Sequence, residues 1–303
     1  EFHLRRARGE GATPEDYFRR FPALAEQLRR LLDMGEATIS TSLVNGRPDT
    51  EDLVVGDQID DFHLLTLLGK GAFASVYLAR QLSMQRLVAL KVSADKGDEP
   101  QLLGQLDHPH IVRVFDVRRL PERRLRLLYM QYVAGGTLQA VIERARRVPL
   151  ADRKGKLIVD AVDVAVERSG HALVGDSSER RRLAASNWPE AVCRLGAQLA
   201  QALAYSHGKD LLHRDVKPAN VLLSHDGSPR LADFNISFSG QIAGATPAAY
   251  FGGSLSYMSP EQLEACNPKH GREAEELDRR SDIYSLGVVL WELLYGERPF
   301  RDE

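Results

Sequence analysis

The sequence predicts an α+β fold in two parts, an antiparallel β-sheet followed by a mainly helical region. Short β-type runs separated by polar turns of hairpin length fill residues 61–133. After Gly135-Gly136 the hydrophobic residues recur with the helical period instead. Hydrophobic residues make up 43% and charged residues 27% of the 303 residues, close to globular averages, so we expect a folded chain and not a disordered one.

The first 60 residues are expected to lie outside this sheet. Residues 1–35 show helical spacing of apolar residues, with Thr13-Pro14 typical of a helix start and Gly35 of a helix end. Residues 36–60 are rich in Thr, Ser, Gly, Pro and Asp, which favours a linker. We interpret residues 1–35 as a small helical segment, and docking of a partner on its apolar face remains the alternative.

Five strand-like runs predict the sheet. They are bounded by polar turns such as Leu120-Pro121-Glu122-Arg123. Connections of hairpin length favour antiparallel pairing of consecutive strands. The runs are Phe62–Leu68, Ser75–Arg80, Arg86–Val92, Ile111–Arg118 and Arg124–Val133.

The second part is predicted to contain three helices, Thr137–Arg147, Pro189–Tyr205 and Ser281–Tyr295. Pro189 suits a first helical turn, whereas Gly208 and Gly296 suit C-terminal stops. Residues 148–187, between the first two helices, have mixed charge and carry no motif. We interpret them as a surface insertion that forms one extra helix and carries no chemistry.

Charge and cysteine content exclude several classes of function. The 40 basic and 42 acidic residues give a net charge of −2, which argues against nucleic-acid binding through bulk charge. Two cysteines, Cys193 and Cys266, exclude a disulfide scaffold and a four-cysteine zinc site, and they are typical of a reducing compartment such as the cytoplasm.

The ends of the chain bear on its location. No apolar run approaches the roughly 20 residues that span a bilayer. The N-terminus has neither an initiator Met nor a signal peptide, so we expect the chain to start partway through a longer product. A membrane tether in a missing C-terminal part is compatible with these observations.

A glycine-rich turn and a lysine suggest phosphate binding. Gly69-Lys70-Gly71 lies between two predicted strands, and glycines let backbone N–H groups approach a phosphate closely. The strand–loop–strand context argues against a dinucleotide fold, in which the glycines open a helix. Lys91 ends the apolar run Val88-Ala89-Leu90 and is costly to bury unless an anion meets it. An edge-strand lysine that reaches solvent is the alternative.

A polar loop supplies the strongest chemical signal. The segment His213–Asn220 contains Asp215, Lys217 and Asn220, and Asp233 follows Asn220 by 13 residues. Two carboxylates, an amide and two lysines are the groups that phosphoryl transfer needs, since a base orients the hydroxyl, oxygen ligands hold Mg²⁺ and lysines offset phosphate charge. A cap or turn role would explain either Asp alone, but the ordered set favours chemistry.

From Asp61 to the end, this ordered set of motifs resembles the eukaryotic-type (Hanks-type) protein kinases, and the bacterial Ser/Thr kinases in particular. Lys217 lies two residues after Asp215, as it does in Ser/Thr kinases. The resemblance implies a bilobal kinase domain over residues 61–303, with an N-lobe at 61–133 and a C-lobe at 134–303. It implies transfer of the γ-phosphoryl of ATP, with Mg²⁺, to Ser or Thr hydroxyls of protein substrates.

The resemblance also assigns roles to individual residues. Asp215 would orient the acceptor hydroxyl, Lys217 would steady the γ-phosphate and Lys91 would contact the α and β phosphates. Asn220 and Asp233 would hold Mg²⁺. The residues that would surround ATP are Gly69, Lys70, Gly71, Val76, Ala89, Lys91, Glu99, Met130, Gln131, Val133 and Leu222.

Regulation and support are implied further along the chain. Arg214 would pair with a phosphate on the activation loop, which makes that loop's hydroxyls candidate autophosphorylation sites. Ser259-Pro260-Glu261 would close the loop, and Asp282 would brace the catalytic loop or cap its own helix. The candidate phosphosites are Ser237, Ser239, Thr246, Ser254 and Ser256.

The sequence departs from the family pattern in several places. Ala74 replaces the third glycine of the phosphate loop, and Asn235 replaces the glycine after Asp233-Phe234. The lysine-pairing acid is expected at Glu99, with Asp95 and Asp98 as alternatives. The family has further helices after the segment that Glu297–Phe300 resembles, so the C-lobe is expected to be incomplete, with exposed apolar surface and low stability.

These departures keep alternatives open. A pseudokinase that binds ATP or serves as a scaffold is the main one. A small-molecule kinase on the same fold is less favoured, because Ser259-Pro260-Glu261 resembles the platform for protein substrates.

Overall fold

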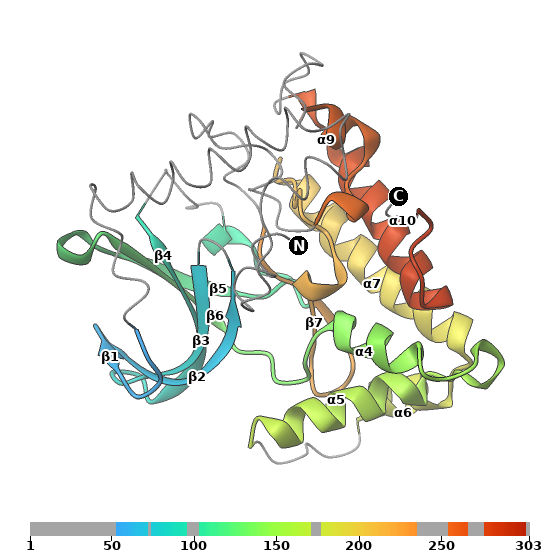
Figure 1. Cartoon of the computed structure of the whole chain (residues 1–303), viewed down its shortest axis with the longest axis horizontal. Coiled ribbons are helices and arrows are strands. Elements are labelled where there is room, and N and C mark those ends of the chain that lie inside the picture. Colours follow the sequence, from blue (N-terminus) through green and yellow to red (C-terminus); the bar gives the residue numbers. More distant parts are fainter. Residues whose placement is uncertain are drawn as a thin grey trace, which may run out of the picture. The chain divides into compact units, whose positions relative to one another are not determined.

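The computed structural model describes residues 53–71, 74–95, 103–170, 177–234, 254–265 and 276–300, all within the unit Leu53–Glu303 (Figure 1). The predicted helical segment of residues 1–35 lies outside these described residues. Within them, an antiparallel sheet precedes a mainly helical region, which confirms the α+β class.

In the described residues, six strands form the larger sheet, with every neighbouring pair antiparallel in the order β1-β2-β3-β4-β6-β5. The five predicted strands are confirmed to within three residues at either end. The strands are β1 (Gln58–Ile59), β2 (Phe62–Lys70), β3 (Ala74–Gln81), β4 (Arg86–Ala94), β5 (Val114–Leu120) and β6 (Leu125–Gln131).

The start of the sheet differs from the expected boundary at Asp61. Strand β1 lies in the stretch interpreted as a linker, and it pairs with the beginning of β2. Leu53 and Ile59 are buried in the core of the sheet, and the Tyr77 hydroxyl donates to the Leu53 carbonyl at 3.0 Å. The turn-forming composition of this stretch hid its few apolar anchors. Gln58–Ile59 therefore forms the first strand of the sheet, and Leu53 packs into its core.

The helical region is built around two long helices that pack against each other, α7 (Trp188–His207) and α10 (Arg279–Tyr295) (Figure 1). Asn187 and Glu190 form a reciprocal capping box at the start of α7, which satisfies backbone donors that a helix end leaves open. All three predicted helices are present, the first as α4 (Leu138–Ala145) with Thr137 as its N-cap. Among the described helices, none combines the length and hydrophobicity needed to cross a membrane.

Residues 148–187 differ from the expected single surface helix. They contain α5 (Lys156–Arg168) and α6 (Ser178–Ala185). Ile158 and Val162 of α5 are fully buried, and Leu183 of α6 is almost so. The apolar residues of α5 therefore form part of the main core, together with α4 and α7.

A small hairpin joins the two parts. Strands β7 (Val221–Leu223) and β8 (Pro229–Leu231) pair antiparallel. Ile111, just before β5, bridges to Leu231, and Thr137 bridges to Leu222. The hairpin therefore contacts both the segment that leads into β5 and the start of α4. The remaining described helices are α9 (Pro260–Ala265) and the 3₁₀ turns 103–105, 121–123, 150–152, 218–220 and 254–257.

Candidate active site

An ion pair connects the sheet to the segment after the small hairpin. Lys91 lies on β4, between β3 and β6, and its Nζ is 2.8 Å from Oδ1 of Asp233. Asp233 follows β8 in the left-handed backbone region (φ 58°), which is costly for a residue other than glycine. Burial raises the pKa of Asp233, but the attraction of Lys91 lowers that pKa by a larger amount. The net pKa of Asp233 is therefore below its usual value. Asp233 is thus held as a carboxylate.

Asp215 lies in a second polar cluster. Asn220 Nδ2 donates to both Oδ2 and the backbone carbonyl of Asp215, each at 2.9 Å. Lys217 Nζ lies 2.7 Å from the same Oδ2. The Ala232 N–H donates to the Asn220 carbonyl at 2.9 Å, which ties this cluster to the residue preceding Asp233. The residues predicted as catalytic or metal-binding are therefore brought together.

His213 is a buried spacer beneath these groups. Its Nδ1 faces the Asp215 N–H at 3.3 Å, and its Nε2 faces the Ala232 carbonyl at 3.0 Å. An N–H facing one nitrogen and a carbonyl facing the other select the neutral tautomer with the proton on Nε2. Burial lowers the pKa of His213 despite the surrounding carboxylates, which also favours the neutral ring.

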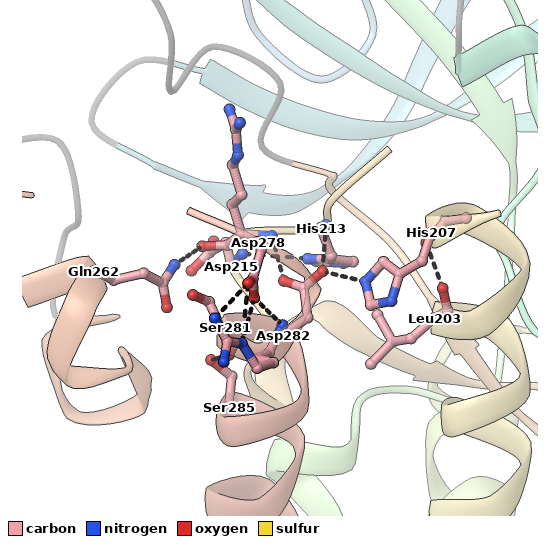
Figure 2. A network of polar contacts seen from close by, with 12 residues as sticks. Leu203, His207, His213, Asp215, Gln262, Asp278, Ser281, Asp282 and Ser285 are labelled. Atoms are coloured by element: carbon pink, nitrogen blue, oxygen red, sulfur yellow. Dashed lines mark hydrogen bonds and ion pairs between the residues drawn. The ribbon is translucent and has the colours of Figure 1, made fainter. Parts of the chain in front are cut away.

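Asp282 of α10 supports the loop from below (Figure 2). Its carboxylate accepts the backbone N–H groups of His213 at 2.8 Å and Arg214 at 2.7 Å. His207 Nε2 contacts the same carboxylate at 2.8 Å. Burial raises the pKa of Asp282, but these partners lower it more, so the net pKa falls below its usual value. The predicted bracing role matches this geometry, whereas the alternative capping role belongs to Asp278.

An apolar cluster lies between the sheet and the small hairpin. Every apolar side chain among the residues predicted to surround ATP belongs to it. These side chains come from β3, β4, β6 and β7, and Val133 comes from the segment just after β6. Its buried members Val112 and Ala232 were not assigned to the site from the sequence, because apolar residues of a strand-like run or a loop do not by themselves indicate which cluster they join. The cluster consists of Val76, Ala89, Val112, Val114, Leu128, Met130, Val133, Leu222 and Ala232.

The strand end and the glycine turn border this cluster. The Gln131 N–H donates to the Arg113 carbonyl at 2.8 Å, so this N–H is already used within the protein. Gly69 pairs with Val76 across β2 and β3, and Lys70 pairs with Ser75. The Gly71 N–H donates to the Ala74 carbonyl at 2.8 Å. A Cβ at Gly69 would meet nothing within 4 Å, so the protein's own packing does not require glycine there.

Several predicted residues lie outside the described part of the chain. Glu99 and Asp98 are among them, and the alternative Asp95 forms an ion pair with Arg119 at 3.7 Å. Ser237, Ser239, Thr246 and the Asn235 substitution are also outside it, as is the side chain of Ser254. Ser256 is described, and its hydroxyl accepts a hydrogen bond from Arg298. Pairing of Lys91 with Glu99 therefore stays a prediction.

Two supporting residues were missed from the sequence. His207 lies at the end of α7 and contacts Asp282, and Gln262 of α9 donates to the Arg214 carbonyl at 3.1 Å (Figure 2). Both contacts join residues far apart in the chain. No local pattern signals such a partner.

The donor set fits a magnesium–nucleotide complex. Within the described residues, no group of three or more His, Cys, Asp or Glu side chains could hold a metal ion alone. Asn220 and Asp233 offer two oxygen ligands, and Asn220 uses its amide nitrogen on Asp215, which leaves Oδ1 for the ion. Mg²⁺ suits such a site, since it takes few protein oxygens and completes its shell with phosphates and water.

Comparison with known proteins agrees with this arrangement. Residues 62–303 match the model of the family described as protein tyrosine and serine/threonine kinase. Serine/threonine-protein kinase PknB of Mycolicibacterium smegmatis is 32% identical over 257 residues, which cover 80% of this chain and 33% of that protein. Serine/threonine-protein kinase PrkC of Bacillus subtilis is 29% identical over 263 residues, 83% of this chain and 33% of that protein. The chain thus spans about a third of the length of these relatives.

Proposed function

The chain belongs to the protein tyrosine and serine/threonine kinase family, and from this membership we propose that it catalyses transfer of the γ-phosphoryl of ATP to Ser or Thr hydroxyls of proteins. The bacterial relatives PknB and PrkC are named Ser/Thr kinases, which supports this choice of acceptor. Lys217, two residues after Asp215, supports it as well.

The observation that carries the proposal is the convergence of two polar clusters. Lys91 and Asp233 are 142 residues apart in sequence and form an ion pair, while Asp215, Lys217 and Asn220 gather beside them. Ala232 connects the cluster around Asp215 to the apolar cluster, since its N–H donates to the Asn220 carbonyl and its side chain joins the apolar cluster. Charge for phosphates, oxygens for a metal ion and an apolar surface for a base thus occur together.

Each residue has a role that follows from its partners. Asp215 receives Lys217 and Asn220 on Oδ2, so Oδ1 would accept the proton of the acceptor hydroxyl and orient it for attack. Lys217 and Lys91 would offset charge on the γ-phosphate and on the α and β phosphates. Asn220 and Asp233 would hold Mg²⁺, which neutralises charge that develops on the phosphate oxygens. Asp233 has its carboxylate available at neutral pH, because its pKa is lowered.

Transfer of label from ATP tests the proposal directly. The chain is incubated with labelled ATP, Mg²⁺ and a generic basic protein, and phosphoserine and phosphothreonine are separated from phosphotyrosine. We expect transfer to Ser or Thr, with a loss of at least about 100-fold in Asp215→Asn and Lys91→Ala. The first substitution removes the carboxylate that would orient the acceptor hydroxyl, and the second removes a charge that would contact the α and β phosphates. Chelation of Mg²⁺ should abolish transfer.

The same assay includes matched control variants and distinguishes an active kinase from a pseudokinase. Asp160→Asn and Lys156→Ala alter an exposed ion pair on α5 and should leave transfer unchanged. Tight binding of ATP without transfer by the unaltered chain would favour the pseudokinase alternative. Mapping of label on the chain itself tests autophosphorylation at Ser237, Ser239, Thr246, Ser254 and Ser256, and an unlabelled loop in an active enzyme would contradict that step.

A further inference from the structure

Gln262 uses both ends of its side-chain amide in the protein interior. It lies on α9, directly after Ser259-Pro260-Glu261, and is 1% exposed. Its Nε2 donates to the backbone carbonyl of Arg214 at 3.1 Å, and its Oε1 accepts the Ser259 N–H at 3.1 Å. The Gln262 N–H in turn donates to Ser259 Oγ at 3.3 Å.

The chemistry of the partners fixes the orientation of this amide. A backbone N–H can only donate, so the oxygen of Gln262 must face Ser259. A backbone carbonyl can only accept, so the NH₂ group must face Arg214. Reversing the amide would oppose donor to donor and acceptor to acceptor, which makes the contact to Arg214 specific for an NH₂ donor.

The hydrogen bond from Gln262 is made to the carbonyl of Arg214, a residue with a strained backbone directly before Asp215. Arg214 has a left-handed backbone (φ 63°), a conformation that a residue other than glycine keeps only when its surroundings hold it. Its N–H is held by Asp282 of α10 at 2.7 Å, and its carbonyl is held by Gln262 of α9. The carbonyl of Arg214 belongs to the peptide group whose N–H is that of Asp215, so Gln262 acts on the peptide that sets the direction of the Asp215 side chain (Figure 2).

We propose that Gln262 is a positioning residue for phosphoryl transfer, which locks the Arg214–Asp215 peptide so that the Asp215 carboxylate faces the acceptor hydroxyl. The inference rests on the proposed function, because it takes Asp215 as the residue that orients the hydroxyl. It also makes the placement of Asp215 depend on α9, so a shift of the Ser259–Ala265 segment reaches the catalytic carboxylate through one hydrogen bond. Asp282 holds the opposite side of Arg214, and His213 Nδ1 accepts the N–H of the same peptide, so Gln262 is the residue that holds its carbonyl.

Two substitutions separate positioning from support of the fold. Gln262→Leu removes both polar contacts, while Gln262→Glu keeps an acceptor for Ser259 but cannot donate to Arg214 when ionised. A buried carboxyl has a raised pKa, and its protonated form restores a donor. Leu263→Ala, at the adjacent and 42% exposed position of α9, is the matched control.

The measurement is kcat and the KM for ATP across pH 5.5–8.5, with melting temperature and ATP binding on the same samples. We expect kcat to fall roughly 10- to 100-fold in both Gln262 variants at pH 8, the scale of a misplaced catalytic group, with the KM for ATP within about twofold of the parent. The kcat of Gln262→Glu relative to the parent should rise as pH falls, while that of Gln262→Leu should not.

Contrary results are distinguishable. Parent-like kcat in folded Gln262→Leu would overturn the inference and leave the proposed function intact. A fall in kcat that tracks melting temperature and ATP binding alike, with no pH-dependent recovery in Gln262→Glu, would assign Gln262 to support of the fold only. Absence of transfer in the parent chain, with ATP still bound, would remove the proposed function and this role with it.

Discussion

Asp282 gathers three donors around one carboxylate and so sets the geometry of the loop above it. The sequence left two roles open for this residue, and the structure separates them, because Asp278 caps α10 while Asp282 lies one turn further in and is 1% exposed. The bracing role could be expected from the family resemblance alone. Its partner His207 could not, since a histidine at a helix end has many simpler uses.

Replacement of Asp282 by Asn should destabilise the fold in a pH-dependent way. At pH 7 we expect the free energy of unfolding to fall by roughly 2–4 kcal/mol, because a neutral amide cannot accept three buried hydrogen bonds. The pKa of Asp282 is lowered in the folded protein. As the pH drops below the ordinary value of 3.8, the unfolded chain therefore binds a proton at this residue before the folded protein does. The carboxylate's contribution is therefore complete above that value and is lost below it.

Denaturant unfolding at a series of pH values checks this expectation. The difference between parent and Asp282→Asn should be constant near neutrality and shrink in acid. Asp278→Asn is the control, because Asn caps a helix about as well as Asp and the site is exposed, so its effect should stay within about 1 kcal/mol. A difference that widened as pH fell would contradict the lowered pKa of Asp282.

The β7–β8 hairpin shows how elements, and not only residues, hold the site together. Asn220 precedes it and Asp233 follows it, so its geometry sets their separation. Leu183 of α6 packs so closely on Gly227 in its turn that an added Cβ would lie 2.5 Å from the Leu183 side chain. Arg180 of α6 donates to the His225 carbonyl at 3.0 Å and pairs with Asp163 of α5. Helix α6, within residues 148–187, therefore packs against the turn of the hairpin.

Truncation of Leu183 measures the importance of this packing. We expect Leu183→Ala to lower the free energy of unfolding by about 2–5 kcal/mol, since it removes a side chain that is only 2% exposed and leaves a cavity. Arg182→Ala, at the neighbouring exposed position, should change it by no more than about 0.5 kcal/mol. Thermal and denaturant unfolding of both variants decide the point. Equal small effects would restore the view of this segment as a surface insertion.

Across the whole molecule, the sequence predicted the sheet and the long helices well, because their apolar periodicity is strong and their ends carry Gly or Pro signals. It also named the polar residues that converge, since motif order implies their meeting. It did not predict that α5 is buried: Ile158 and Val162 have the same spacing on a surface helix as in a core. Burial depends on what the rest of the chain offers as a partner.

One face of α10 leaves large apolar side chains in contact with solvent. Ile283, Trp291 and Tyr295 are 43–50% exposed, and Phe300 beyond the helix is 59% exposed. Such a face promotes self-association.

Polar substitution of this face should reduce association of the chain. We expect Ile283→Lys together with Trp291→Gln to lower light scattering at high protein concentration, with little change in melting temperature because neither side chain is buried. Met84→Gln, which alters a 63% exposed apolar residue on the sheet region, is the control and should leave scattering unchanged. Scattering that stayed high in the double variant would show that the chain does not self-associate through this face of α10.

Both ring nitrogens of His213 are occupied by contacts within the protein, which limits the transfer of protons through this side chain. One nitrogen takes the Asp215 N–H and the other gives its proton to a backbone carbonyl, so the imidazole has no vacant position from which to relay a proton during turnover. In the proposed reaction, the proton of the acceptor hydroxyl would therefore pass to a group other than this ring, such as the Asp215 carboxylate. Any ionisation that controls turnover near neutrality should belong to the nucleotide or the acceptor, not to this imidazole.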